Sequence, residues 1–319
     1  MDDGFSERSG LDDAFGVDRG QLSGVDDAFS AHRGQLFGVA YRMLGSRADA
    51  EDVVQDAWLR YAGADTSDVA DLRAWLITVT GRLCLDHLRA AKIRREAYVG
   101  PWLPAPLVER LPDPAQVDPG ERVSFRDSVS TALLLVLDAL TPEQRVAFVL
   151  HDVFAVPFAE VAATLGTTVE NARQLASRAR RAVADGEHRH TTDRARQEQV
   201  LAAFTAAAAG GDLDALLRIL APDVVAIGDG GGVASAARHP IVGALAVARF
   251  LLGLYRRALR HGHSVQPALV NGDLGLVVRM PDTGETAIAS LAISPAGLIT
   301  GIYNQLNPAK VPPLSLDEL

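Results

Sequence analysis

Residues 36–62 read LFGVAYRMLGSRADAEDVVQDAWLRYA, and their pattern predicts two helices joined by a tight turn. Apolar residues recur at helical spacing on both sides of Gly45, where the first helix is expected to end. Ser46, followed three residues later by Asp49, is typical of the start of a second helix. The apolar residues of that helix form one stripe: Ala50, Val53, Val54, Ala57, Trp58 and Tyr61. Four polar residues lie off the stripe: Glu51, Asp52, Gln55 and Asp56.

A third helix is expected from Leu72 to Arg95, after a polar loop at residues 63–71. Residues 82–95 are basic, with Asp86 as their single acid. Their basic side chains are Arg82, Arg89, Lys92, Arg94 and Arg95. Trp75, near the start of this helix, either packs in the core or stacks on a nucleic-acid base. Considered alone, the acidic face of the preceding helix is an ordinary solvated face.

Residues 100–120 form the clearest linker, because their six prolines are incompatible with a helix. At about 3.1 Å per residue, such an extended segment reaches roughly 65 Å. Its segment WLPAPL (102–107) is too apolar for a simple spacer. Trp102, Leu103 and Leu107 would each contribute about 1.5–3 kcal/mol on burial, so we expect this segment to dock elsewhere on the chain.

A second helical block, residues 121–185, contains a helix-turn-helix pattern. Residues 141–144, TPEQ, predict a capped helix start. A short helix at residues 158–165 stops at Gly166, and a longer helix follows at residues 169–184. The polar side chains of the longer helix lie away from its apolar face: Arg173, Gln174, Ser177, Arg178, Arg180 and Arg181. Arginine and glutamine read guanine and adenine edges, with the first half of such a helix nearest the bases. The alternative is a solvated arginine face.

Residues 194–319 predict a domain of different character, with helices first and strands afterwards. Helices are expected at 197–209, 213–220 and 241–259, and strands at 223–228, 264–270, 273–279, 285–293 and 298–303. Asn271-Gly272-Asp273 is typical of a tight hairpin. This order favours an α+β domain, a curved sheet with helices packed into its concave face.

Candidate acid–base residues in this last block, judged by residue type, are Asp223, Asp229, His239, His261 and His263. None has a spacing that defines a general base against a substrate, so we expect no catalytic residue, no cofactor and no metal site. Gly230, Gly231 and Gly232 instead indicate close backbone packing, which we expect to involve the WLPAPL linker.

The length of 319 residues predicts two or three domains. The net charge of −9 is unevenly distributed: residues 1–27 carry eight acids and two arginines, whereas residues 82–95 and 173–181 each carry a net +4. The acidic leader holds the first copy of a motif repeated at 10–22 and 24–36, and this copy is expected to be disordered. A single cysteine, no apolar run of about 18 residues and no signal-peptide pattern predict a reduced, cytoplasmic protein.

Residues 36–62 and 71–95 (DLRAWLITVTGRLCLDHLRAAKIRR) resemble region 2 of the bacterial extracytoplasmic-function (ECF) sigma factors, and residues 140–183 resemble their region 4. The last block resembles a SnoaL-like domain of the NTF2-like superfamily. The segments YVGPWLPAPL (98–107), GDGGG (228–232) and NPAKV (307–311) resemble marks of group 41 of these factors, which carries such a fused tail. Ala105 and Ala309 replace acidic residues of those segments, so contacts that need these carboxylates are not expected.

The resemblance implies a multidomain chain of two all-α helical sigma domains, the second with the helix-turn-helix, followed by an α+β NTF2-like cone. We expect a leader at 1–27, the region 2 domain at 28–97, the linker at 98–120, the region 4 domain at 121–186, the SnoaL-like domain at 195–309 and a tail at 310–319.

The resemblance also implies an alternative sigma factor, not an enzyme, whose partners are core RNA polymerase and promoter DNA. The face of Glu51, Asp52, Gln55 and Asp56 would dock on the clamp of the β′ subunit, and a further contact with the β flap is expected. Trp75 and the basic residues of 82–95 would hold the −10 element, while the six polar residues of the helix at 169–184 would contact the −35 element. The tail would regulate the factor in cis, without a membrane anti-sigma factor, through Trp102, Leu103, Leu107, Asp229, Gly230, Gly231, Gly232, Asn307, Pro308 and Lys310.

Two other interpretations stay open. A helix-turn-helix regulator that acts without polymerase would have no use for residues 36–95. A SnoaL-like enzyme on a DNA-binding tether would need a defined acid–base pair in the cone. A small-molecule ligand of the tail is also left open. Docking of the linker near residues 229–232 and 307–311 would give a closed form, with which polymerase must compete.

Overall fold

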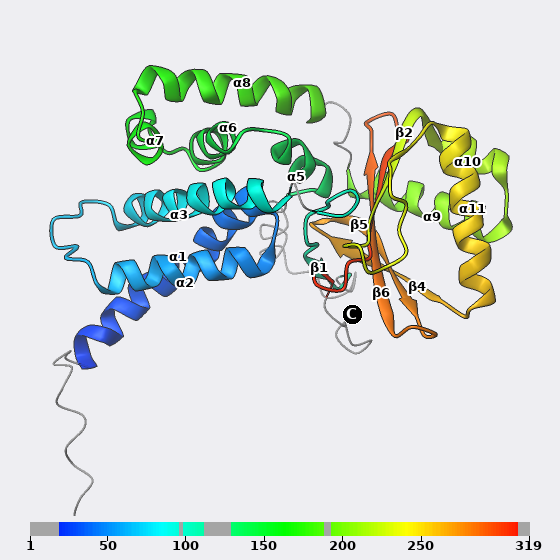
Figure 1. The fold of residues 1–319 in the computed structure, drawn as a ribbon, viewed down its shortest axis with the longest axis horizontal. Helices are drawn as coiled ribbons and strands as arrows, with labels where there is room; N and C mark the ends of the chain where they lie inside the picture. Colours follow the sequence, from blue (N-terminus) through cyan, green and yellow to red (C-terminus); the bar gives the residue numbers. More distant parts are fainter. Residues whose placement is uncertain (1–18, 96–97, 112–128, 188–192, 312–319) are drawn as a thin grey trace, which may run out of the picture.

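The computed structural model describes residues 19–95, 98–111, 129–187 and 193–311. Figure 1 shows the helices of the first half on one side and the sheet domain on the other, with the linker between them. The leader before residue 19, the linker after residue 111 and the tail after residue 311 lie outside the described residues, as do the side chains of Lys92, Arg94 and Arg95.

The region 2 domain consists of helices α1 (Arg19–Leu44), α2 (Arg47–Ala62) and α3 (Leu72–Arg95). The Ser46 side chain caps α2 by accepting a hydrogen bond from the Asp49 amide at 3.3 Å. The predicted leader requires a correction, because α1 already begins at Arg19. Buried Phe29, whose ring lies 6.2 Å from that of Tyr61, anchors this helix, and adding turns to an existing helix costs little.

The region 4 domain consists of α5 (Thr131–Asp138), α6 (Pro142–Phe148), a π-helical turn η2 (Val149–Val153), α7 (Phe158–Leu165) and α8 (Val169–Glu187). Thr141 and Gln144 form the expected capping box at the start of α6. Gly166 ends α7 in the left-handed conformation, at φ +63°. The turn of the helix-turn-helix lies where it was predicted, and α8 continues three residues beyond its expected end at residue 184.

One continuous apolar core runs through both helical domains, from Leu36 and Met43 in region 2 to Leu150 and Ala176 in region 4. Buried Arg145 crosses between them: its guanidinium donates to the Met43 carbonyl oxygen at 2.7 Å and pairs with Asp138 at 2.8 Å. The two sigma domains are thus packed against each other.

The C-terminal domain contains helices α9 (Arg194–Gly210), α10 (Leu213–Ile219) and α11 (Ala244–Arg260). Its strands are β2 (Leu220–Asp229), β3 (Ile241–Val242), β4 (Ser264–Val270), β5 (Asp273–Met280), β6 (Glu285–Ile293) and β7 (Ile299–Gln305). The sheet also includes β1 (Val108–Glu109), and its order is β1-β4-β5-β6-β7-β2-β3, antiparallel except between β2 and β7. The α+β class and the preceding helical domains are as expected from the sequence.

Two details of this sheet differ from the prediction. The helix expected at 241–259 begins at Ala244, because Ile241 and Val242 pair with β2 before Gly243 turns the chain at φ +95°. The linker contributes a strand that was not predicted, β1 (Val108–Glu109), which pairs with Val270 and Leu269 at the edge of the sheet. A segment from between the sigma domains therefore completes the C-terminal sheet.

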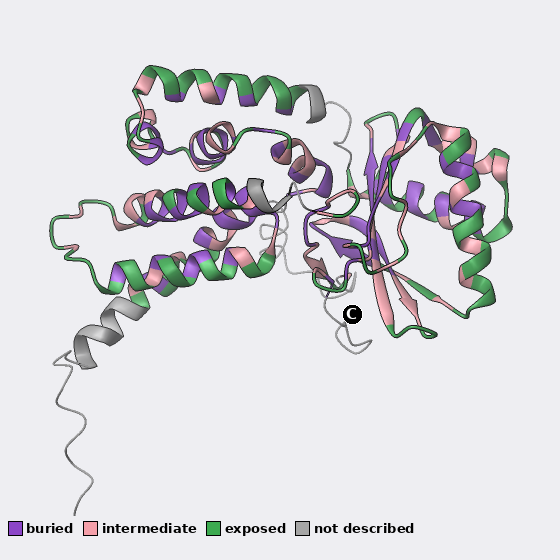
Figure 2. Cartoon of the chain, in the orientation of Figure 1, coloured by how far each residue is buried: buried purple, intermediate pink, exposed green. Residues whose placement is uncertain are grey.

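Both faces of the sheet are buried. Alternate side chains point to opposite faces, so Leu269 packs with the core under α9–α11 while Ala268 and Val270 pack on the other face. That other face contacts the linker and α5: Leu103 and Ala132 lie in one apolar cluster with Ala292 and Tyr303. The linker and α5 therefore pack on this second face of the sheet, on the side of the two helical domains (Figure 2).

Candidate functional site

The acidic face of α2 is open to solvent. Glu51, Asp52, Gln55 and Asp56 are all exposed, while Val53 and Val54 beside them are buried. Glu51 forms an exposed ion pair with Arg47 at 2.8 Å, within the same helix. This face is available to a partner in the closed arrangement of the two sigma domains.

Two basic side chains of α3 contact region 4 while they remain exposed to solvent. Arg82 donates to the Ala163 carbonyl oxygen of α7 at 3.4 Å, and Arg89 pairs with Glu143 of α6 at 3.0 Å. Trp75 is partly buried, with its ring 6.2 Å from that of Tyr61. Two of the side chains expected to hold the −10 element thus make contacts to the other sigma domain.

The outer side of α8 is exposed (Figure 2), and all six of its predicted DNA-contacting residues lie there: Arg173, Gln174, Ser177, Arg178, Arg180 and Arg181. The Arg173 guanidinium lies 5.7 Å from the centre of the Phe158 ring. Arg180 pairs with Asp152 at 2.7 Å, so DNA binding by Arg180 would have to break this pair. The first half of the helix, which is expected to contact bases, is exposed.

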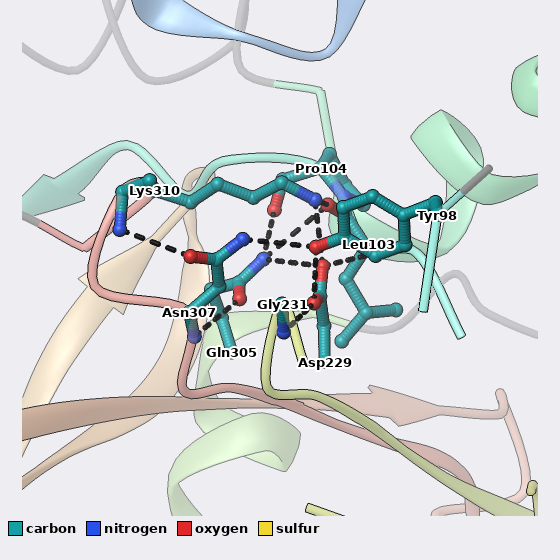
Figure 3. A network of polar contacts seen from close by, with 9 residues as sticks. Tyr98, Leu103, Pro104, Asp229, Gly231, Gln305, Asn307 and Lys310 are labelled. Carbon is teal, nitrogen blue, oxygen red and sulfur yellow. Dashed lines mark hydrogen bonds and ion pairs between the residues drawn. The ribbon is translucent and has the colours of Figure 1, made fainter. Parts of the chain in front are cut away.

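Asp229, the last residue of β2, is completely buried at the centre of a polar network between the linker and residues 305–310 (Figure 3). Its carboxylate accepts hydrogen bonds from the Tyr98 hydroxyl at 2.6 Å and the Leu103 amide at 2.9 Å. The Lys310 ammonium pairs with it at 2.6 Å and donates to the Leu103 carbonyl oxygen at 2.7 Å. Burial alone would raise the pKa of Asp229, but the hydrogen bonds from Lys310, Tyr98 and Leu103 hold it below its usual value.

Further groups complete this arrangement, which we call the Asp229 network: Tyr98, Leu103, Asp229, Gln305, Asn307 and Lys310. The Gln305 amide donates to the carbonyl oxygens of Leu103 at 3.3 Å and Pro104 at 3.2 Å. The Lys310 ammonium also lies 4.4 Å from the centre of the Trp102 ring and 4.8 Å from that of Tyr98. The linker is therefore bound through its backbone as well as its side chains.

The glycine turn after Asp229 permits this close approach. The Gly231 amide donates to Asp229 Oδ1 at 3.0 Å, at φ +61°, and a Cβ atom there would collide with the Asn307 side chain. Gly232 lies against Val99, while Pro308 is exposed. Gly231 and Gly232 thus pack against residues 307 and 99, and Gly230 against Ala234 and Ala236, and not against WLPAPL itself as the sequence suggested.

The opposite side of the linker rests on the region 2 domain. The Ala105 amide donates to the Gly45 carbonyl oxygen at 2.8 Å. A Cβ atom on Gly45 would lie 3.1 Å from the Trp102 ring and 3.2 Å from Pro104, so this turn needs glycine for contact as well as for its φ of +65°. The segment WLPAPL is held between two domains.

A second polar centre was not predicted from the sequence; we call it the Asn271 junction, and it consists of Tyr41, Leu107, Thr131, Asn271 and Ser290. Asn271 Oδ1 accepts from the Leu107 amide at 2.8 Å and lies 2.9 Å from the Tyr41 hydroxyl of region 2. Its Nδ2 donates to the Thr131 hydroxyl of region 4 at 3.1 Å, which lies 3.0 Å from that of Ser290. The hairpin motif and its left-handed Asn271, at φ +54°, were predictable, but the partners of the side chain were not.

The candidate acid–base residues of the C-terminal domain are either engaged by other side chains or exposed. Asp229 is engaged in its network, Asp223 and His239 are exposed, and His261 and His263 pair with Asp282 at 3.0 and 3.3 Å. Among the described residues no cluster of three or more His, Cys, Asp or Glu side chains could hold a metal ion. None of the described helices combines the length and hydropathy that a membrane-spanning segment needs.

Comparisons with known proteins agree with this layout. Residues 28–93 match the family Sigma-70 region 2, and residues 130–183 match Sigma-70, region 4. The ECF RNA polymerase sigma factor SigJ of Mycobacterium tuberculosis is 49% identical over 249 residues, 74% of this chain and 75% of that protein. A probable ECF RNA polymerase sigma factor of the same species, SigI, is 36% identical over 86% of this chain and 91% of its own length.

A solved structure shows that the whole arrangement has a precedent. The crystal structure of M. tuberculosis SigJ superposes with a TM-score of 0.73 at 44% identity, covering 91% of this chain and 99% of that one. The similarity therefore includes the C-terminal domain and extends beyond the two sigma regions.

Proposed function

The chain belongs to the ECF RNA polymerase sigma factors, which bind core polymerase and promoter DNA to direct transcription initiation, and from this premise we propose that its C-terminal domain regulates it in cis. In this proposal the C-terminal domain holds the sigma domains in a closed arrangement that binding to polymerase and promoter must open. No separate membrane anti-sigma factor is then required, and the protein acts where its polymerase is, in the cytoplasm.

The proposed division of labour follows the exposed surfaces. The α2 face of Glu51, Asp52, Gln55 and Asp56 docks on core polymerase, and the first half of α8 reads the −35 element. The basic end of α3, with Trp75 near its start, binds the −10 element. These assignments rest on the sigma family and on the chemistry and exposure of the side chains.

The contacts between α3 and region 4 support the closed state as an inactive one. DNA that contacts Arg82 and Arg89 must replace the contacts of these side chains with Ala163 and Glu143. The shared apolar core opposes separation of the domains as well. Arg82 and Arg89 are exposed but contact region 4, so both are fully free to bind DNA only when region 4 moves away.

The observation that carries the proposal is the linker, which is bound to both neighbours at once. Leu103 is tied to Asp229 of the C-terminal domain, and two residues later Ala105 is tied to Gly45 of region 2. Strand β1 continues the linker into the C-terminal sheet, beside the Asn271 junction that reaches Thr131 of region 4. A separation of the sigma domains that moves this linker must break contacts with the C-terminal domain.

Run-off transcription with purified core polymerase on genomic DNA tests the proposal. We expect full-length wild-type protein to start at defined promoters, and Asp229→Asn to raise transcript yield at the same promoters. Asp214→Asn, an exposed acid on α10, is the matched control and should behave as wild type. No defined starts from either protein would refute promoter recognition, while equal yields from wild type and Asp229→Asn would refute regulation in cis.

A further inference from the structure

The outer side of α11 carries a third basic surface, which the sequence patches at 82–95 and 173–181 do not include. Residues 230–272 contain five arginines and no aspartate or glutamate, although the whole chain has a net charge of −9. Four of the five lie on α11, and all four are exposed: Arg249, Arg256, Arg257 and Arg260. In the described part of the chain, none of these four side chains forms an ion pair.

Helix geometry concentrates these charges on one stripe. Val247, Ala248, Leu251 and Leu252 form the buried side of α11. At 100° per residue, Arg249, Arg256 and Arg260 point the opposite way, with the small exposed residue Gly253 between them. The stripe is about 16 Å long, at 1.5 Å per residue. Figure 2 shows this outer side of α11 as exposed, away from the linker and the sigma domains.

The stability of the α11 helix accounts for only some of these arginines. Arg257 and Arg260 lie in the last helical turn, where a cation is favoured by the helix dipole. Arg249 and Arg256 lie outside that turn, so the helix dipole does not account for them, and Arg256 and Arg260 are like charges at the i,i+4 spacing, where they repel one another. A partner with closely spaced negative charges would relieve this repulsion.

Tethering places such a partner within reach. α8 ends at Glu187 and α9 begins at Arg194, so the seven-residue step between them spans at most about 25 Å at 3.3–3.6 Å per residue. When α8 binds duplex DNA, the C-terminal domain must stay near that duplex, whatever the position of region 2. We propose that the arginine stripe of α11 binds the phosphate backbone of the DNA next to the −35 element. This inference rests on the proposed contact of α8 with DNA.

Phosphates fit this surface chemically. Guanidinium groups bind phosphate oxygens through paired hydrogen bonds, and duplex DNA carries one charge per ~1.7 Å of its axis. The stripe does not combine arginine with the Asn or Gln side chains that read base edges. It therefore adds affinity without sequence preference. The C-terminal domain would thus contribute to promoter binding in the open state, in addition to closing the unbound protein.

The test uses full-length protein in the holoenzyme, on a promoter fragment located by run-off transcription. Arg249→Ala/Arg256→Ala is compared with wild type and with Arg33→Ala/Arg60→Ala, which removes the same charge from exposed positions of region 2. Loss of two phosphate contacts should lower the slope of log Kd against log salt by about 1.8. Hydroxyl-radical protection next to the −35 element should weaken, while the start site stays the same.

The outcomes separate this inference from the proposed function. An unchanged salt slope and footprint in the α11 variant, with normal initiation, would overturn the inference alone. An equal slope change in the region 2 control would also overturn it, since the effect would then be one of general charge. If the holoenzyme failed to initiate at all, the proposed function would fail, and the same salt titration of the full-length chain on a random-sequence duplex would still decide whether α11 binds phosphate.

Discussion

Replacement of Asp229 by asparagine should loosen the linker, because this carboxylate is the central acceptor of the Asp229 network. Asparagine has nearly the same shape, but it removes the negative charge that Lys310 pairs with at 2.6 Å. It also offers one acceptor oxygen in place of two, whereas Tyr98 and Leu103 donate to different oxygens of Asp229. The substitution therefore breaks contacts without creating a cavity.

The size of the effect follows from burial. Removing one partner of a fully buried ion pair costs about 3–5 kcal/mol. The Asp229 side chain is 0% exposed but that of Lys310 is 15% exposed, so water partly compensates the lysine. We expect a loss of about 2–3 kcal/mol in the free energy that keeps the linker bound, which is roughly a 30- to 150-fold increase in linker opening.

Amide hydrogen exchange measures this opening directly. The amides of Leu103, Ala105 and Leu107 donate to Asp229, Gly45 and Asn271, so each reports on a different side of the linker. Their protection should fall about 30- to 150-fold in Asp229→Asn, while amides within α9 keep theirs. Asp214→Asn serves as the control.

The wild-type protein should also show an acid dependence that the variant lacks. Because the pKa of folded Asp229 is lowered, its stabilisation is complete above the ordinary carboxyl pKa of about 4 and is lost as the pH falls through the lower, folded value. Protection of Leu103 that is equal in both proteins, at neutral and at acid pH, would refute the assignment of Asp229 as the main contact of the linker.

Three further outcomes are expected. Asp52→Arg/Asp56→Arg should weaken co-purification with core polymerase by reversing charge on the exposed α2 face, with an unchanged melting temperature; undiminished co-purification would contradict the docking assignment. Arg173→Ala should relax base preference at the −35 element by about 1–3 kcal/mol, whereas Arg181→Ala should lower affinity uniformly and flatten its salt dependence; identical footprints and salt slopes for both would contradict this division. Asn271→Gly keeps the left-handed backbone but removes the amide that joins Tyr41, Leu107 and Thr131, so transcript yield should rise in run-off assays; wild-type yield would show that the Asn271 junction does not restrain the sigma domains.

Local sequence patterns determined the helical part of this protein. The stripe on α2, the Ser46 cap, the Thr141 capping box and the Gly166 stop depend on residues within a few positions of one another. The polar residues of α8 could be placed on its outer side for the same reason, since helical periodicity decides which side is buried. The acidic face of α2 was predictable as exposed, although only the family resemblance suggested its partner.

The Asp229 network was predictable only in outline. The glycines after Asp229 and the apolar WLPAPL segment signalled close packing, but not which atoms would meet. Tertiary structure brings Tyr98 and Lys310 to the carboxylate across 131 and 81 positions of sequence. These partners stabilise the buried charge, because an unpaired carboxylate in the interior would be costly in free energy.

Strand β1, the contacts of α3 with region 4 and the Asn271 junction were decided by tertiary structure alone. Val108–Glu109 is too short to carry a strand period, and it becomes a strand because the edge of β4 offers unpaired backbone groups. Arg82 and Arg89 look the same in the sequence whether they face DNA or region 4. Asn271 occupies a turn that the dipeptide Asn271-Gly272 specifies, but its side chain forms hydrogen bonds with Leu107 and Thr131, 164 and 140 positions away. Periodicity determines which side of an element is buried, whereas the identity of the group on the other side depends on how distant segments pack, and that information is not contained in any local stretch of the chain.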